Sequence, residues 1–476
     1  MIIMALSYLY HAQLARYMKW HVLDLPEWYI DILMPPFYWK SIWTYAYSKL
    51  SSGSSKLWLF SQPILKMCGS VLSLVRACAL AATCLALFSG AQAQMKISSF
   101  DGAVTDEELK SFNDFVATLK PGTDNKGNEW AQGHSGEHTK AMGLVYLMAG
   151  QQATLDEMLR FCDAVLSQRN DLAKAPVGQH KVWTGSVDPV WPNDPTQNPI
   201  ETGGEQGDPV GHLASCAYLI LKTNDLYDQK VTIGDPHHYG TTYLDRAKKY
   251  VKEADVAMNN HILSSLLDLS KDNRMYFAKD SPYKGGDPVP WNQQMMFNYA
   301  LQNLRGAHHI LGDNATLEET YGSIVASSLD WFFNGGGVQK KSSSQGNAIY
   351  DWGYAMPKTT GEDSNHGALD VAGFSRAYIE GSYGLSEDDM KPFANTFVDV
   401  MSLGGGKWAG TVEGDNKDGH ASPTDYIRGG YLFLAEFRPD AYEDMMAADL
   451  QVSKTTKSTD QFSRFLWVKN QRATLK

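Results

Sequence analysis

The stretch YDWGYAMPKTTGEDSNHGALDVAGFSRAYIE, residues 350–380, decides how the rest of the chain is interpreted. It begins with aromatic residues and glycine, passes through a loop with proline and threonine, and continues as a helix-like pattern rich in small residues. Glu362, His366 and Asp370 follow an i, i+4, i+8 spacing, which predicts that they share one helix face. Because burying such groups without partners is costly, we expect this face to line a cleft.

Paired helical patterns recur on both sides of this stretch. Apolar patterns with small residues predict inner helices, which begin near residues 137, 208, 292, 365 and 425, and a charged amphipathic pattern follows each of them. Their uneven spacing argues against a solenoid with a strict period. The lack of strand alternation argues against a parallel-sheet enzyme. The sequence therefore predicts a mainly α fold, an (α/α) toroid or barrel of about six to seven helical hairpins.

The chain before these helices divides into two segments. Residues 67–93 combine basic residues with a short apolar run and end in Ala91-Gln92-Ala93, which is the form of a secretory signal peptide. The alternative, a transmembrane anchor, would need a longer apolar run. Residues 1–66 have no assigned function and are either a gene-model extension upstream of Met67 or a membrane-associated leader. Residues 94–476 are expected to form a single catalytic toroid domain.

Composition narrows the classes of partner. The 476 residues are 43% hydrophobic and 20% charged with a formal net charge of −11, which argues against a general nucleic-acid binder. An anionic sugar needs only a local basic cluster and is not excluded. Outside the predicted signal peptide only Cys162 and Cys216 remain, so they either pair in an oxidising compartment or are buried free thiols. The Asn314-Ala315-Thr316 sequon is consistent with a secreted glycoprotein.

An unusual polar loop precedes each inner helix. The loops carry His134, Glu137 and His138; Glu205, Asp208 and His212; Trp291, Asn292 and Gln293; Glu362, Asn365 and His366; and Thr424, Asp425, Tyr426 and Arg428. Inner helices of antiparallel hairpins start at one end, so we expect these clusters to converge on one mouth, where helix N-termini favour anions. Helix capping explains Asp208 or Ser364. It does not explain the accompanying histidine, tryptophan and tyrosine.

Aromatic residues near the same loops suit stacking on sugar rings, although some are expected in the core. A cleft lined by aromatic, amide, imidazole and carboxylate groups favours a carbohydrate ligand. The expected substrate-binding residues are Trp291, Asn292, Gln293, His212, Glu205, Glu362, Trp352, Trp183, Trp191 and His138.

Three motifs carry a resemblance to a known class of enzyme. PWNQQ at residues 290–294, GEQGDPVGH at residues 204–212 and the block at residues 350–370 resemble secreted polysaccharide lyases with an (α/α) toroid, of the alginate and glucuronan lyase type. The resemblance covers the organisation of most of residues 130–440. It implies β-elimination on a uronate-containing polysaccharide. The C5–H bond becomes acidic only once the carboxylate charge is offset, so pre-placed donors are essential.

The resemblance also implies catalytic roles. In such lyases a His or Tyr takes the C5 proton, which favours His366 as the base, and a Tyr protonates the leaving oxygen, which favours Tyr354 as the acid. Tyr426 is a second candidate for the acid. The candidates for neutralising the carboxylate are Asn365, Asn292 and Arg428.

Other histidines are rivals for the role of base. His261, in the Asn260-His261 pair, falls late in a charged outer pattern and is expected on a solvated surface. His308 and His309 lie in a helix that ends at Gly312, where packed or capping pairs are common. His237 and His238 fall in a Pro/Gly loop and could line the cleft.

Two other functions stay open. A glycoside hydrolase on the same architecture would use paired carboxylates, with Glu205, Asp208, Glu362, Asp363 and Asp370 as candidates. A non-catalytic carbohydrate-binding protein is the further alternative. No metal or cofactor is expected, because the HExxH, EF-hand and phosphate-binding spacings are absent. The expected partner is an acidic polysaccharide outside the cell, with no nucleic acid and no stable membrane association of the mature chain.

Overall fold

The computed structural model describes residues 94–122, 135–175, 178–192, 194, 196–416 and 421–474. The extension at 1–66, the signal peptide at 67–93 and His134 lie outside the described residues. Residues Ala91–Lys476 form one compact unit. Its described part is mostly helical, with short antiparallel strand pairs, which confirms the mainly α prediction.

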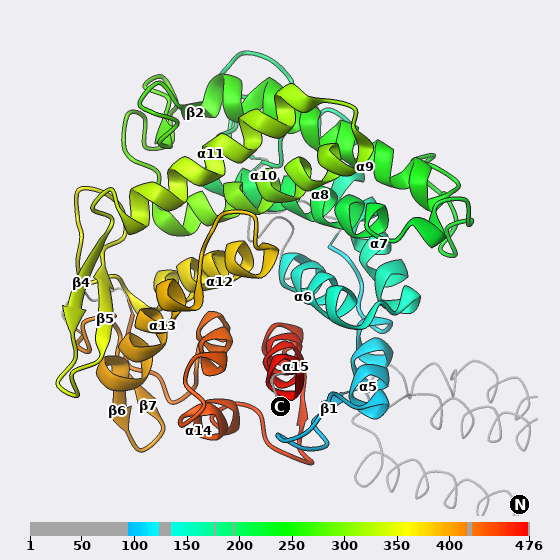
Figure 1. Ribbon diagram of the computed structural model, residues 1–476. Helices are drawn as coiled ribbons and strands as arrows, with labels where there is room; N and C mark the ends of the chain where they lie inside the picture. The colour runs from blue at the N-terminus through cyan, green and yellow to red at the C-terminus, as the bar shows by residue number, and fades with distance from the viewer. Residues whose placement is uncertain are drawn as a thin grey trace, which may run out of the picture. The chain divides into compact units, whose positions relative to one another are not determined.

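Six segments, called the inner segments below, contact one another in a closed order. They are α6 (Ser135–Ala149), α8 (Gly207–Leu221), α10 (Trp291–Leu311), α12 (Ser364–Glu380), the 3₁₀ segment η5 (Gly429–Glu436) and α15 (Thr459–Thr474). Each contacts the next, and α15 contacts α6 again. Figure 1 shows α6, α12 and α15 around the centre of the unit.

The predicted starts of the inner helices agree with four of these segments. Near residues 137, 208, 292 and 365 the helices begin within two residues of the expected positions. The helix expected from residue 425 is instead the short segment η5. The last described helix, α15, was not among the expected inner helices, and it contacts both η5 and α6.

The remaining helices pack on the outer side of the inner segments. They are α5 (Asp106–Val116), α7 (Gln152–Ser167), α9 (Tyr243–Ala257), α11 (Ala315–Phe333), α13 (Glu387–Asn395) and α14 (Tyr442–Ala447). Helix α7 contacts α6 and α8, α9 contacts α8, α11 contacts α10, and both α13 and α14 contact η5. In Figure 1, α5, α11 and α13 lie further from the centre than α6, α12 and α15. Thr105 and Glu108 form a capping box at the start of α5.

Small residues let the inner segments approach one another closely. A Cβ atom at Gly207 of α8 would collide with the backbone of Met296 in α10. A Cβ atom at Gly373 of α12 would likewise collide with the side chain of Met295. The small-residue patterns read from the sequence therefore mark helix–helix contacts, where close packing maximises dispersion attraction.

Short segments connect and extend the helices. Two 3₁₀ turns, η1 (Gly204–Gln206) and η2 (Asn224–Leu226), flank α8, and two π-helical segments, η3 (Met258–Leu266) and η4 (Thr396–Met401), extend α9 and α13. The strand pairs are β1 (Met95–Lys96) with β8 (Thr455–Thr456), β2 (Leu267–Asp268) with β3 (Tyr276–Phe277), β4 (Val338–Ser342) with β5 (Ala348–Trp352), and β6 (Ser402–Gly404) with β7 (Lys407–Trp408). Strand β5 leads the chain into the loop before α12.

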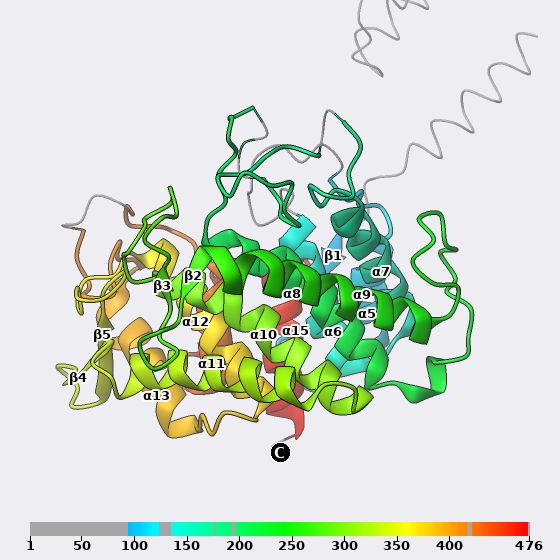
Figure 2. The same cartoon turned by 90° about the horizontal axis from the view of Figure 1, so that it is seen from above.

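A second view shows where one of the connections lies. The long loop between α7 and α8 stands on the upper side of the unit in Figure 2, and α15 ends on the lower side. Within the described ranges, no helix combines the length and the apolar character that crossing a membrane requires.

Candidate functional site

The start of α12 holds a histidine–aspartate pair. Asp363 is the N-cap of the helix, and its Oδ1 accepts hydrogen bonds from the backbone N–H groups of Asn365 (2.9 Å) and His366 (3.0 Å). Its Oδ2 accepts a hydrogen bond from Nδ1 of His366. A neutral imidazole with its proton on Nδ1 carries a lone pair on Nε2. Among the described residues this Nε2 has no hydrogen-bond partner, so it is available as a base.

The charge state of Asp363 supports this arrangement. Burial alone would raise the pKa of Asp363, but hydrogen bonds from the side chain and backbone of His366 outweigh burial and lower it. Asp363 therefore stays ionised and can stabilise a protonated His366. The His366 side chain is 32% exposed, so a substrate can reach it.

Tyr354 lies beside this pair. The ring centroids of Tyr354 and His366 are 4.8 Å apart, and Nζ of Lys284 donates a hydrogen bond to Oη of Tyr354 at 3.2 Å. Burial raises the pKa of Tyr354 well above its ordinary value, and the nearby Tyr283 and Glu362 raise it further. The phenol is therefore protonated at neutral pH and can donate a proton.

Two of the three motifs behind the resemblance meet next to Tyr354. Nε2 of Gln293 donates hydrogen bonds to Oη of Tyr283 (2.7 Å) and to Oε1 of Glu205 (3.3 Å). The approach depends on a glycine, because a Cβ atom at Gly204 would clash with the Gln293 side chain. Glu205 on η1 and Gln293 on α10, two predicted substrate-binding residues, are thus neighbours.

Two buried acids lie behind the pair. Burial raises the pKa of Glu362 to about 10, and the charges of Asp370 and Asp363 add to the effect. Burial also raises the pKa of Asp370 well above its ordinary value, although its Oδ2 accepts a hydrogen bond from Nε1 of Trp352 at 2.8 Å. Oε2 of Glu362, Oδ1 of Asp370 and Oη of Tyr431 have no hydrogen-bond partner within the described ranges.

The prediction that Glu362, His366 and Asp370 share one helix face is wrong. Helix α12 begins at Ser364, so Glu362 lies in the loop before it. His366 bonds to Asp363, and Asp370 points into the core against Trp352. The physical reason is that the Asp363 side chain caps the helix and fixes its start after Glu362.

A cavity of about 280 Å³, called the first cavity, lies next to this pair. It is lined by residues near the starts of α6, α10, α12, η5 and α15. Four predicted site residues line it together: Asn292, Asn365, Tyr426 and Arg428. Nη1 of Arg428 donates hydrogen bonds to Oδ1 of Asn365 (3.2 Å) and to Oη of Tyr426 (3.4 Å). The structure therefore brings these four together, while His366 and Tyr354 lie beside the cavity rather than on its lining.

Three tryptophans predicted to bind substrate lie in the core. Nε1 of Trp191 donates to the backbone oxygen of Val165 at 2.8 Å, Trp291 packs edge-on against Trp331, and Trp352 bonds to Asp370. All three side chains are buried. The prediction that they stack on sugar rings is corrected, because no ring face is exposed. Trp183 is half-buried and packs against His261.

Two predicted substrate-binding histidines join helices. His212 is fully buried, and its Nδ1 lies 3.4 Å from Oη of Tyr299, so it connects α8 with α10. The prediction that it contacts substrate is therefore corrected. Nδ1 of His138 lies 2.7 Å from Oγ1 of Thr459 and connects α6 with α15. Neither histidine lines the first cavity.

The rival histidines also have defined places. His261 is fully buried, so its expected position on a solvated surface is wrong, while Asn260 beside it is exposed. His308 is packed, as expected, and contacts Asp255 and Asp313. His237 stacks on Tyr239 in an exposed loop.

Glu362, Asp363 and His366 offer one ligand atom each within 4.8 Å of one another and so have the geometry for a metal ion. Their donor atoms are partly used already. Both oxygens of Asp363 and Oε1 of Glu362 accept N–H hydrogen bonds.

Several basic residues at the site were not predicted from the sequence. Lys284 contacts Tyr354, and Lys140, Arg376 and Arg464 line the first cavity. Arg376 could have been found from its spacing. Residues 365, 369, 372 and 376 all line the cavity and follow helical spacing, so the face that begins at Asn365 is the relevant one.

Models of known protein families do not match the chain, and no curated protein matches it. The function is therefore argued from the geometry of the site.

Proposed function

We propose that the chain is a polysaccharide lyase that cleaves a uronate-containing polysaccharide, alginate or glucuronan, by β-elimination. One observation carries the proposal: a histidine with an open Nε2 lies against a protonated tyrosine, beside a cavity lined by arginine and asparagine. The closed order of contacts among the inner segments supports the corresponding fold, an (α/α) toroid of helical hairpins.

In this mechanism His366 and Tyr354 act in turn. Nε2 of His366 takes the proton from C5 of the uronate, and Asp363 stabilises the imidazolium that forms. The bond between C4 and the glycosidic oxygen breaks as the C4–C5 double bond forms. The phenol of Tyr354 gives its proton to the leaving oxygen. Lys284, whose Nζ lies 3.2 Å from the phenol oxygen, stabilises the resulting phenolate.

The first cavity supplies the charge that makes the C5 proton acidic. Arg428, held by Asn365 and Tyr426, presents a guanidinium that matches a carboxylate. Asn292 is buried and lines the same cavity, where its amide can donate a second hydrogen bond. These donors are fixed before the substrate binds, which is what stabilisation of a developing carbanion requires. Neither a metal nor a cofactor takes part in the proposed reaction.

The proposal is tested with purified chain and alginate or glucuronan. The expected result is an increase in ultraviolet absorbance from the unsaturated uronate product. New reducing ends without this absorbance would instead support the glycoside hydrolase, for which the buried Glu362 and Asp370 are the candidate pair. Binding of oligosaccharide without either signal would support a non-catalytic carbohydrate-binding protein.

Secretion and glycosylation belong to the same proposal. Asn314 caps α11 through its Oδ1, which accepts a hydrogen bond from the N–H of Leu317 at 3.1 Å. The amide nitrogen that would carry a glycan makes no part of this cap. Expression through a eukaryotic secretory route should therefore give a chain whose mass falls on treatment with an N-glycosidase, and Asn314→Asp should abolish the change.

A further inference from the structure

A second cavity, of about 340 Å³, meets the first one among the inner segments. All six inner segments contribute residues to its lining. Lys140, Ala372, Arg376, Asp460 and Arg464 line both cavities. These five residues therefore mark the junction of the two cavities.

The charges at the junction do not balance. Lys140 pairs with Asp208 at 2.7 Å, and Arg464 pairs with Asp460 at 2.6 Å. Among the described residues Arg376 makes neither a hydrogen bond nor an ion pair. Two of the three cations thus have their own carboxylates, and the guanidinium of Arg376 is left over.

Arg376 is held in place without being neutralised. Its guanidinium carbon lies 4.4 Å from the ring centroid of Tyr299, a cation–π contact that uses one face of the group. Burial lowers the pKa of Arg376, and the neighbouring Arg464 lowers it further, against the opposing influence of Asp208. The side chain of Arg376 is partly exposed to the two cavities. A partly desolvated cation without a paired carboxylate is still costly for a folded chain. An anion bound at the junction would offset this cost.

We propose that Arg376 binds the carboxylate of a uronate unit at the junction of the two cavities. A guanidinium fits a carboxylate with two parallel hydrogen bonds. The second cavity adds groups suited to the rest of a sugar. Gln302 and Trp467 are buried and line this cavity. In the described part of the chain, neither Oε1 of Gln302 nor Nε1 of Trp467 has a hydrogen-bond partner. Sugar hydroxyl groups can donate to the first and accept from the second.

The inference deepens the proposed function and rests on it for the choice of sugar. The proposed reaction occurs at His366 and Tyr354, beside the first cavity. Arg376 lies on α12 three turns further along, and no catalytic step uses it. A bound chain would therefore be held by a second acidic unit, which favours a polysaccharide that is acidic at successive positions over one with isolated uronates.

The test compares Arg376→Gln with the matched control Arg305→Gln. Arg305 lies over the Tyr383 ring at 5.4 Å and lines neither cavity. Binding of D-glucuronate, D-glucose and sulfate is measured by calorimetric titration at constant ionic strength, and the melting temperature of each ligand-free protein is recorded. We expect glucuronate to bind the wild type and Arg305→Gln equally. Its affinity for Arg376→Gln should fall at least about tenfold, the effect of losing one charged pair.

The ligand-free proteins distinguish a binding residue from a structural one. We expect Arg376→Gln to melt at or above the wild-type temperature, because removing an uncompensated cation relieves its burial. Arg376→Lys should retain part of the affinity, because it keeps the charge but loses the paired hydrogen bonds. A lower melting temperature for Arg376→Gln, unchanged glucuronate affinity, or binding of sulfate or glucose as tight as that of glucuronate would each overturn the inference.

The two proposals can fail separately. If polymer gives no unsaturated product but glucuronate binding depends on Arg376, the lyase proposal falls and the junction site stands. If product forms and Arg376→Gln has the wild-type affinity for glucuronate, the junction site falls and the lyase proposal stands.

Discussion

Two histidine–aspartate pairs lie in different surroundings within this chain. In both, Nδ1 of the histidine contacts an aspartate: His366 contacts Asp363, and His261 contacts Asp188 at 2.9 Å. The two pairs differ in the partner of the other ring nitrogen, Nε2. Nε2 of His261 lies 2.9 Å from the hydroxyl oxygen of Thr202, whereas no such partner for Nε2 of His366 is found in the described residues.

Burial separates the two pairs further. His261 is fully buried, and the Trp183 ring packs edge-on against it with centroids 4.8 Å apart. His366 is partly exposed, and its neighbour is a tyrosine that can move a proton. Both histidines follow an asparagine in the sequence, so the local pattern is the same. The comparison teaches that the partner of the second nitrogen decides whether such a pair can do chemistry.

The largest effect on kcat is expected when each of the two histidines is replaced separately by glutamine. His366→Gln should lower kcat by about 10³-fold, within the range for loss of a general base. His261→Gln should keep kcat within about threefold, since the proposed reaction does not use it. Initial rates of unsaturated-product formation measure both. Equal losses in two folded variants would contradict the division between the pairs.

Removing the proton donor should have the next largest effect. Tyr354→Phe should lower kcat by about 10²-fold with little change in KM, because the ring stays beside His366 while the acid is lost. Tyr426→Phe, which alters the exposed second candidate for the acid and removes its hydrogen bond from Arg428, is measured alongside it. If Tyr426→Phe loses more activity than Tyr354→Phe, the assignment of the acid is reversed.

For the free energy of unfolding, we expect the opposite order: loss of His261 should cost more than loss of His366. Burial alone would raise the pKa of Asp188, but hydrogen bonds from His261 and Thr184 outweigh burial and lower the pKa of this buried acid. His261→Ala removes the first of these bonds from a buried carboxylate, so the free energy of unfolding should fall by about 3 kcal/mol. His366→Ala should cost less than about 1 kcal/mol, because Asp363 still caps α12 through the backbone. Urea denaturation of both variants measures the difference. A larger loss for His366→Ala would show that the exposed pair is the structural one.

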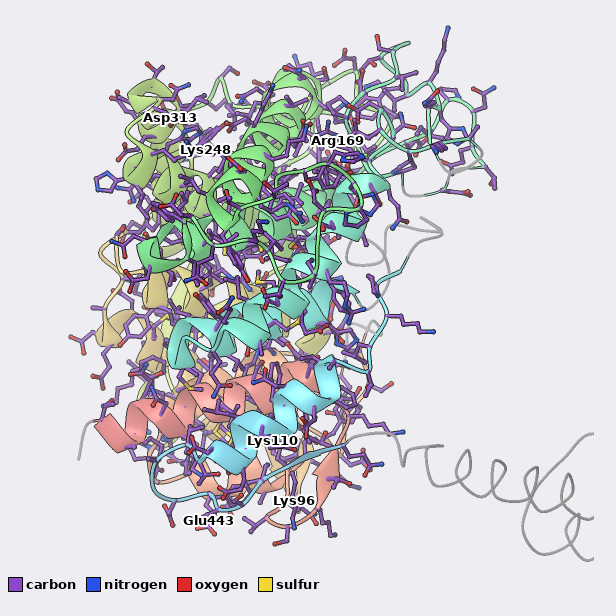
Figure 3. The ribbon with its side chains drawn as sticks, turned by 90° about the vertical axis from the view of Figure 1, so that its right-hand side faces the viewer. Lys96, Lys110, Arg169, Lys248, Asp313 and Glu443 are labelled. Atoms are coloured by element: carbon purple, nitrogen blue, oxygen red, sulfur yellow. The ribbon has the colours of Figure 1, made fainter. Side chains whose placement is uncertain are left out.

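A third histidine, His308, extends the comparison to the pH dependence of stability. Nδ1 of His308 contacts Asp313 at 2.7 Å and Nε2 contacts Asp255 at 3.1 Å, and Oη of Tyr321 also donates to Asp255. Burial alone would lower the pKa of His308, but the two carboxylates outweigh burial and raise it to about 9. Figure 3 shows Asp313 and Lys248, which line the same surface pocket, at the end of the unit opposite Lys96 and Glu443.

The sign of the pH effect follows from this shift. The pKa of His308 is higher in the folded chain than in the unfolded chain. Its contribution to the free energy of unfolding is therefore complete below about pH 6.5 and is lost as the pH rises through about 9. Because Asp313 is half-exposed, we discount the effect to about 1–2 kcal/mol. Denaturation of the wild type and His308→Gln at pH 6 and pH 9.5 tests it. A stability gap that does not shrink at the higher pH would refute the assignment.

Metal removal should have the smallest effect. Both oxygens of Asp363 and Oε1 of Glu362 already accept hydrogen bonds, so we expect chelation to leave the rate unchanged. Activity is measured after dialysis against a chelator and again after addition of divalent cations. Loss and recovery of activity would mean that His366 serves as a ligand rather than as a base.

The sequence predicted the helices better than the side chains they carry. Small-residue periodicity located four inner segments because it records close helix contacts such as that at Gly207. The short segment η5 was not distinguished from a helix, because its apolar pattern is the same. For Cys162 and Cys216 the sequence left two states open, a disulfide or buried free thiols, and the structure shows buried free thiols.

Side-chain roles depended on contacts that sequence does not contain. Trp191, Trp291 and Trp352 have the same composition signal as sugar-binding tryptophans, yet the packing of distant helices buries them. Asn292 and Arg428 reach one cavity as expected, because helix starts gather there. Arg376 was missed because its significance rests on the pairing of Lys140 and Arg464 with other carboxylates.

The position of α15 has a consequence for biosynthesis. This helix touches both η5 and α6, and its Lys469 forms a buried ion pair with Glu108 of α5 at 3.0 Å. The closed order of contacts among the inner segments therefore depends on residues 459–474. We therefore expect chains shortened before α15 to lose these contacts and to be degraded.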